Sequence, residues 1–150
     1  MRALLSLALL LSMGLPGLAQ DGLVTKPSKY SVKESMDKLA AALDAKGIKP
    51  LARVNHAAAA QANGLELKPT EVMMFGNPKV GTPLMQANRR VAIDLPMRVL
   101  AWEDDKGKTW IAYVPPKTLK ARYKIKGKEQ DEALKAMDGA LEAFTKAATE

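Results

Sequence analysis

Apolar residues return along much of this chain with the spacing of amphipathic helices. Ser31, followed three residues later by Glu34, matches a capping box, and Gly47 suits the end of the helix that would follow. The apolar positions between them lie on one helical face: Val32, Met36, Leu39, Ala40 and Leu43. A second stripe comprises Leu134, Met137, Leu141 and Phe144. The pattern predicts a helix from residue 32 to about 46 and another from about 129 to 146.

Short runs rich in β-branched and aromatic residues predict about five strands. They cover residues 23–30, 48–54, 72–75, 97–102 and 109–114, and Pro27 favours an edge position for the first. The acidic and glycine-containing loop 103–108 predicts a hairpin between the last two. Residues 120–126 alternate basic and apolar side chains, which predicts a further half-exposed strand. With a short helix over residues 56–63, capped by Asn55, the pattern predicts a single α+β domain with helices packed on a largely antiparallel sheet.

Residues 72–85 carry the densest set of conformational constraints in the chain. The buried strand predicted at 72–75 runs into Gly76, which tolerates unusual backbone angles, and Pro78 holds Asn77 extended. Thr82 followed by Pro83 then predicts a helix start, which Arg89 and Arg90 would end. We interpret this stretch as a rigid corner between a strand and a helix.

The first 19 residues have the form of a secretory signal peptide. Arg2 supplies the positive start, residues 4–11 form an apolar stretch too short for a membrane span of about 20 residues, and small residues precede a cleavage site near Ala19. We therefore expect a periplasmic or secreted domain of residues 20–150. The chain has no cysteine, so disulfides and thiol chemistry are excluded.

The charge balance is basic, with a net charge of +7. In an exported protein this charge favours weak attraction to anionic lipid or polysaccharide, and we expect no nucleic acid partner. The basic residues at the end of the 120–126 pattern would meet an anionic membrane surface: Lys120, Arg122, Lys124, Lys126 and Lys128. The alternative is that they form a solvated sheet edge that discourages aggregation.

Several motifs resemble the bacterial family known as domain of unknown function 302. They are His56-Ala57, the run 64–70, Phe75 to Met85, Asp94-Leu95-Pro96 and the Trp102 to Pro115 hairpin. The resemblance extends over residues 30–121. It implies a compact α+β domain, a homodimer and no assigned reaction. Many similar chains carry an arginine–histidine pair where this one has Arg122-Tyr123, so this member would lack that histidine if the family's function needs it.

His56 is the only histidine, so imidazole chemistry would have to use it. With Met85 it could bind copper or haem, although core packing also explains the methionines. A structural zinc site is nearly excluded, because one histidine without cysteine cannot supply four nitrogen or sulfur ligands. The cofactor is therefore left unassigned.

The sequence also offers candidates for acid–base catalysis and for anion binding. Asp94 or Glu66 could act with His56 in a hydrolase-like enzyme, but an aspartate before Leu-Pro is commonly a turn residue. Lys79 could hold an anion at a helix start. No ordered catalytic set is recognisable, so no catalytic residue is assigned.

We therefore expect a non-enzymatic, exported protein that binds a small ligand near the 72–85 corner. Trp102, Trp110 and Tyr113 could stabilise the sheet, line a pocket or form a dimer face. The candidate ligand-binding residues are His56, Phe75, Gly76, Asn77, Pro78, Lys79, Gly81, Thr82, Asp94 and Trp102.

Overall fold

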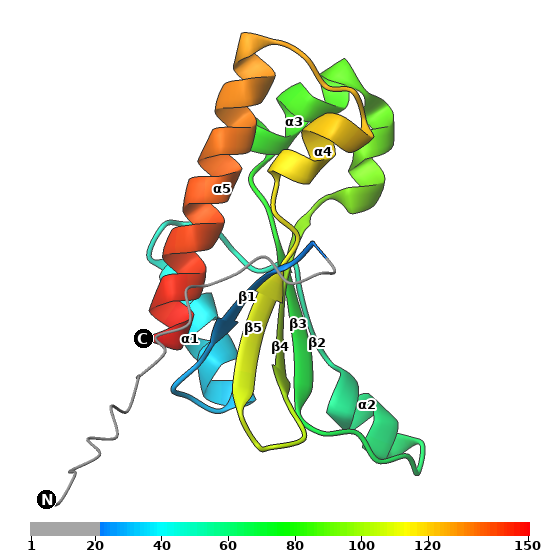
Figure 1. Cartoon of the computed structure of the whole chain (residues 1–150), viewed down its shortest axis with the longest axis vertical. Coiled ribbons are helices and arrows are strands. Elements are labelled where there is room, and N and C mark those ends of the chain that lie inside the picture. The colour runs from blue at the N-terminus through cyan, green and yellow to red at the C-terminus, as the bar shows by residue number, and fades with distance from the viewer. Residues whose placement is uncertain (1–21) are drawn as a thin grey trace, which may run out of the picture.

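Five strands form one antiparallel sheet in the computed structural model, which describes residues 22–150 (Figure 1). The strand order is β1-β5-β4-β3-β2. The proposed signal peptide and its cleavage site lie outside the described residues. In chain order the elements are β1 (Val24–Pro27), α1 (Val32–Asp44), β2 (Ala52–Asn55), α2 (His56–Ala62), β3 (Thr70–Phe75), α3 (Pro78–Ala87), the 3-10 helix η1 (Arg89–Asp94), β4 (Met97–Glu103), β5 (Thr109–Tyr113), α4 (Lys117–Arg122) and α5 (Lys128–Thr149). The predicted α+β class and the largely antiparallel sheet are confirmed.

One face of the sheet is covered by α1 and α5. Strand residues alternate between the two faces, and β3 directs Glu71, Met73 and Phe75 to the covered face. Their partners Ala101, Val99 and Met97 on β4 point the same way. The opposite face carries Val72 and Met74 of β3 with their neighbours on β4 and β5, and no helix of the described chain lies in front of these strands in Figure 1.

The α1 helix begins as its sequence predicts. The Ser31 side chain accepts the backbone N–H of Glu34, and the Glu34 carboxylate accepts the backbone N–H of Ser31 at 3.0 Å. This capping box satisfies donors that have no partner within the helix. The helix then buries Met36, Leu39 and Leu43 completely, so its predicted apolar face is the face that meets the core.

The last helix, α5, is longer than the sheet that it covers. Its 22 residues span about 33 Å, whereas the seven residues of β4 span about 23 Å. The C-terminal half packs on α1 and the sheet, where Lys26 of β1 pairs with Glu142 at 2.7 Å. The N-terminal half extends past the strands and packs on α3, where the Gln130 side chain donates to the Pro83 carbonyl at 3.2 Å (Figure 1).

The predicted start of α3 is wrong. The helix begins at Pro78, with the Asn77 side chain accepting the Lys79 N–H, so Thr82 and Pro83 lie inside it. Two cap-and-proline pairs occur five residues apart, and both are adequate local start signals. The first pair starts the helix, which ends at Ala87 rather than at the arginines; these belong to η1.

The predicted strand at residues 120–126 is also wrong. This segment holds the end of α4 and a turn at Lys124, whose φ is 52°. Leu119 and Tyr123 are buried and lie four residues apart, which is a helical spacing. The strand that precedes this segment, β5, is already paired on both sides by β1 and β4, so no further strand can pair with β5. The predicted strand 48–54 is shortened to β2 at Ala52–Asn55.

Candidate functional site

A cavity of about 420 Å³ lies at the corner between β3 and α3. Phe75, Gly76, Asn77, Pro78 and Gly81 form one wall. The other walls come from segments distant in sequence: Ile48 and Leu51 before β2, Ala92, Leu95, Pro96 and Met97 around the start of β4, and Ala136, Met137, Ala140, Leu141 and Phe144 of α5. The corner predicted from sequence therefore borders a real recess, which closes against the last helix.

Small residues keep this recess open. Gly81 and Ala92 face it from one side, and Ala136 and Ala140, one helical turn apart, face it from α5. A Cβ atom added at Gly76 would lie 3.3 Å from the Pro96 Cβ, so the corner packs tightly against the start of β4 there. Protein interiors normally leave few voids larger than a water molecule. A cavity of this size is instead within the range of about 300–1,000 Å³ that is typical of ligand pockets.

The cavity is chemically apolar. Asn77 is the one lining residue with a polar side chain, and its Oδ1 already accepts the Lys79 N–H at 3.0 Å. Phe75 and Phe144 meet edge to face, with ring centroids 5.9 Å apart. Such walls favour hydrocarbon or aromatic groups, and they place no pair of titratable side chains where a substrate would sit.

The structure gathers about half of the predicted ligand-binding residues at this cavity. Phe75, Gly76, Asn77, Pro78 and Gly81 line it, as does the metal candidate Met85. Lys79 and Thr82 are exposed neighbours that do not line it. Trp102 is directed to the opposite face of the sheet, because it pairs with Thr70 and not with a residue on the Phe75 face.

His56 lies at the other end of β3. His56 follows Asn55, the last residue of β2, which pairs with Glu71 on β3. The cavity begins at Phe75, which lies four residues, or about 13 Å, beyond Glu71 along β3. His56 therefore does not line the cavity that Met85 lines, and the carboxylate of Asp94 bonds to Arg122 and Tyr123. Glu66 lines a separate, wide groove beside α2. Within residues 22–150, no three histidine or carboxylate side chains gather as metal ligands.

Asp94 belongs to a different cluster. Its Oδ2 accepts hydrogen bonds from the Tyr123 hydroxyl at 2.5 Å and from Arg122 Nη1 at 3.0 Å. The hydrogen bond to this carboxylate is the main reason why the pKa of Tyr123 is raised. The two segments that the family resemblance singled out, Asp94-Leu95-Pro96 and Arg122-Tyr123, are therefore in contact.

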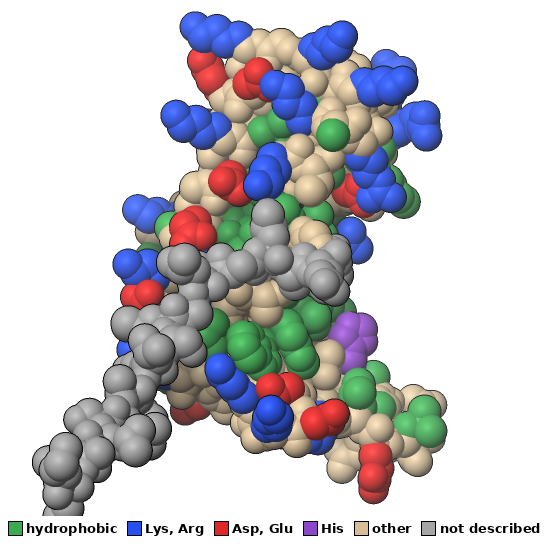
Figure 2. All heavy atoms as spheres, in the orientation of Figure 1, with side chains coloured by type: hydrophobic (Ala, Val, Ile, Leu, Met, Phe, Trp, Pro, Cys, Tyr) green, Lys and Arg blue, Asp and Glu red, His purple; other side chains and the backbone are tan. Residues whose placement is uncertain are grey.

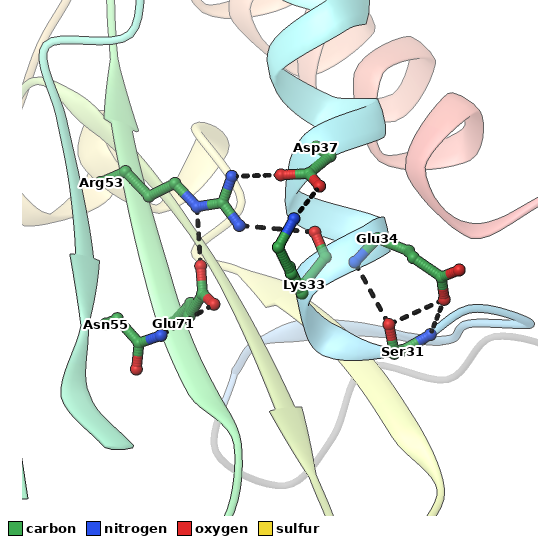
Figure 3. Close-up of polar contacts among 7 residues, drawn as sticks. All are labelled: Ser31, Lys33, Glu34, Asp37, Arg53, Asn55 and Glu71. Carbon is green, nitrogen blue, oxygen red and sulfur yellow. Dashed lines mark hydrogen bonds and ion pairs between the residues drawn. The ribbon is translucent and has the colours of Figure 1, made fainter. Parts of the chain in front are cut away.

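An ionic network centred on the buried Glu71 joins α1 to the sheet (Figure 3). Glu71 has only 7% of its side chain exposed, and it accepts hydrogen bonds from Arg53 Nε at 2.7 Å and Asn55 Nδ2 at 3.1 Å. Arg53 also reaches Asp37 on α1, which in turn pairs with Lys33. Every carboxylate here has a cationic partner, so we assign the network a structural role. Strand alternation places Glu71 on the same face as Met73, a signal that sequence analysis missed.

The fold and these contacts define a single α+β domain with an apolar cavity between its sheet and its last helix. Residues 24–144 match the family described as "Domain of unknown function DUF302". The chain belongs to this family, as the sequence motifs had indicated.

A solved relative has the same fold. It is the crystal structure of an uncharacterized conserved protein DUF302 from Bacillus stearothermophilus, with a TM-score of 0.72 and 19% identity. The match covers 85% of this chain and 98% of that chain.

Relatives in Brucella are more similar in sequence. Proteins of B. suis biovar 1 (strain 1330) and B. abortus biovar 1 (strain 9-941), each named fluoride-specific ion channel FluC 1, are 45% identical to this chain over 117 residues. The matched segment is 78% of this chain but 46% and 43% of those proteins, so the chain spans less than half the length of either. None of the helices within residues 22–150 is long and apolar enough to cross a membrane.

The α1 network predicts a loss of stability in acid. Hydrogen bonds from Arg53 and then Lys33 are the main causes that lower the pKa of Asp37. A carboxyl whose pKa is lower in the folded state stabilises the fold above its unfolded pKa, and this contribution is lost as pH falls through the folded pKa. We therefore expect the free energy of unfolding to fall as pH drops below about 4. Asp37→Asn should flatten this decline in urea titrations made at several pH values. Parallel pH profiles for the two proteins would contradict the role given to Asp37.

Proposed function

We propose that this chain is an exported, non-enzymatic binding protein that holds a small apolar molecule in the cavity at the β3–α3 corner. The observation that carries the proposal is the cavity of about 420 Å³ whose walls are hydrocarbon on every side except at Asn77. Export rests on the signal-peptide pattern of residues 1–19.

The chemistry of the walls indicates the kind of ligand. Burial of apolar surface stabilises a complex by roughly 25 cal/mol per Å² removed from water, and here nearly all of the wall can contribute in this way. Asn77 is the one side chain that could orient a polar group of the ligand. We therefore expect a compact hydrocarbon or aromatic molecule with few polar atoms, held mainly by shape and by exclusion of water.

The alternative functions receive less support from this geometry. Copper or haem binding would need His56 and Met85 together, and a hydrolase-like reaction would need Asp94 or Glu66 beside His56. Met85 lines the cavity, Asp94 contacts Arg122, and Glu66 lies in the groove beside α2. Because these groups are in different places, we propose neither reaction chemistry nor a metal for the cavity.

Filling the cavity should separate ligand binding from stability. In Ala140→Leu the added carbon atoms would occupy space between α5 and the corner, so we expect an apolar fluorescent probe to lose at least tenfold in affinity. The melting temperature should stay the same or rise, because filling a cavity commonly stabilises a fold. Fluorescence titration and thermal unfolding of the same samples check both expectations.

Ala143→Leu is the matched control, since it makes the same change on the exposed side of α5. It should bind the probe as the unaltered protein does. Equal affinity in all three proteins would contradict the cavity as the binding site, and so would failure of the unaltered protein to bind any apolar probe saturably.

We also propose a homodimer, as the family resemblance implies. The sheet face opposite α1 and α5 supports it, because Figure 2 shows hydrophobic side chains gathered over the strands there. Strand alternation assigns to this face Val54, Val72, Met74, Leu100, Trp102 and Trp110. Faces of this kind on monomers commonly mark interaction sites, and in a two-fold dimer the same residues would meet each other.

Sedimentation velocity tests the dimer. The unaltered protein should have the mass of two chains, and Leu100→Glu should give single chains because it would place a charge in the contact. Ile93→Glu, at a residue with 77% of its surface exposed in η1, should leave the dimer intact. A single-chain mass for the unaltered protein up to high micromolar concentration would contradict the proposal.

A second candidate function is contact with an anionic membrane surface. Residues 78–98 and 117–128 contain ten lysines and arginines and one acid, Asp94, a net charge of +9 against +7 for the whole chain. Figure 2 shows these basic side chains gathered over the end of the molecule that holds α3 and α4. The name of the Brucella relatives adds support, because an ion channel works in a membrane and this domain type is part of those longer proteins.

Membrane contact of this kind should depend on salt. We expect co-sedimentation with vesicles that contain anionic lipid at low ionic strength, and loss of that binding above about 0.15 M salt because the charges are then screened within about 8 Å. Replacement of Lys124, Lys126 and Lys128 by glutamine should weaken binding at low salt. Binding that ignores salt, or no binding at any salt concentration, would contradict the proposal.

A further inference from the structure

A small crevice lies where η1, the start of β4, the end of β5 and α4 meet. Its volume is about 60 Å³, more than the roughly 10–15 Å³ that one water molecule requires. It is lined by Asp94, Met97, Arg98, Val114, Leu119 and Arg122. The crevice is separate from the apolar cavity: Met97 is the one residue that both contain.

The guanidinium groups of Arg98 and Arg122 line this crevice, and each has N–H donors that make no hydrogen bond to the described residues. Arg122 donates from Nη1 to Asp94 at 3.0 Å and makes no other hydrogen bond within residues 22–150. Arg98 has no hydrogen-bond or ion-pair partner among the described residues. A guanidinium carries five N–H donors arranged as a fork, so both arginines retain donors for a further acceptor.

Asp94 positions Arg122 and does not cancel the charge of the crevice. Its Oδ2 is shared by the Tyr123 hydroxyl and Arg122, and Tyr123 is itself buried. Asp94 Oδ2 thus accepts two hydrogen bonds, and this carboxylate is the single acid among the ten basic residues of segments 78–98 and 117–128. Counting the lining alone, two arginines face one carboxylate, which leaves a net charge of +1.

The remaining walls of the crevice are apolar. Met97 and Leu119 are buried, and Val114 adds a third apolar side chain. Both arginines are exposed, with 67% of the Arg122 side chain accessible, so an anion in solution can reach both guanidinium groups. The fork geometry of arginine matches the paired oxygens of phosphates and carboxylates.

We propose that the crevice between Arg98 and Arg122 binds a small oxyanion of the phosphate type, with Asp94 and Tyr123 holding Arg122 in place. The volume of about 60 Å³ restricts the occupant to a small group. Such a group reaches it either as a free inorganic ion or as the head of a phospholipid, and both would be recognised by the same two arginines.

Isothermal titration of the full domain with inorganic phosphate tests this site. We expect saturable one-to-one binding that Arg98→Gln and Arg122→Gln each weaken at least tenfold. Arg89→Gln is the matched control, because it removes one charge from the same end of the molecule without touching the crevice. It should change the affinity less than twofold. Circular dichroism melting of each variant checks that the fold is retained.

Short-chain phosphatidate, titrated in the same way below its micelle concentration, identifies the source of the oxyanion. Tighter binding than that of inorganic phosphate, with the same dependence on Arg98 and Arg122, supports a lipid head. Equal or weaker binding with that dependence supports the free ion.

The proposal is overturned if phosphate does not bind saturably, or if Arg89→Gln weakens it as much as the two crevice variants do. The second result would indicate diffuse attraction to the basic end. That attraction is the basis of the membrane contact proposed above, so the two proposals can fail separately.

Discussion

The packing of α5 along and beyond the sheet is the constraint on which the rest of this structure depends. The C-terminal half of the helix buries Leu141, Phe144 and Ala148 over the strands, and the N-terminal half has no sheet beneath it. An apolar stripe that leaves the sheet must still be buried, and α3 supplies the second surface. The cavity lies where α5 passes from packing on a sheet to packing on a helix. Small residues at this junction, such as Ala136 and Ala140, leave it unfilled.

The two ends of the domain consequently have different properties. At the α1 end, Arg53 pairs with the buried Glu71 and every carboxylate in its network is matched, which favours rigidity over chemistry. At the α3 end lie the apolar cavity, the Arg98–Arg122 crevice and the ten lysines and arginines of segments 78–98 and 117–128. An apolar ligand in the cavity and an oxyanion in the crevice would therefore be bound at the same end of the molecule. The two sites are neighbours, but their chemistry differs.

Much of this architecture could be predicted from the sequence, because many of its elements depend on residues that are close together in the chain. The Ser31–Glu34 capping box and the Trp102–Trp110 hairpin depend on residues close in sequence, and both are present. The start of α3 could not be decided in this way, since Asn77-Pro78 and Thr82-Pro83 offer equivalent caps. The alternation at residues 120–126 was equally ambiguous, because a buried Tyr123 and Ile125 suit a strand or a helix end. The corner within residues 72–85 could be identified from the sequence, but the opposite wall of the cavity could not. The alanines of α5 reach the cavity only through long-range packing, and no spacing within the sequence encodes that contact.

The central claim is that the junction between α5, α3 and the sheet holds an unfilled recess with apolar walls. A crystal of the protein held under xenon pressure tests it most directly, since xenon enters apolar cavities and has no affinity for filled ones. The account predicts xenon density between Phe75, Pro78 and Met137. Crystals that show side chains or ordered water in that space, and no xenon, would contradict it.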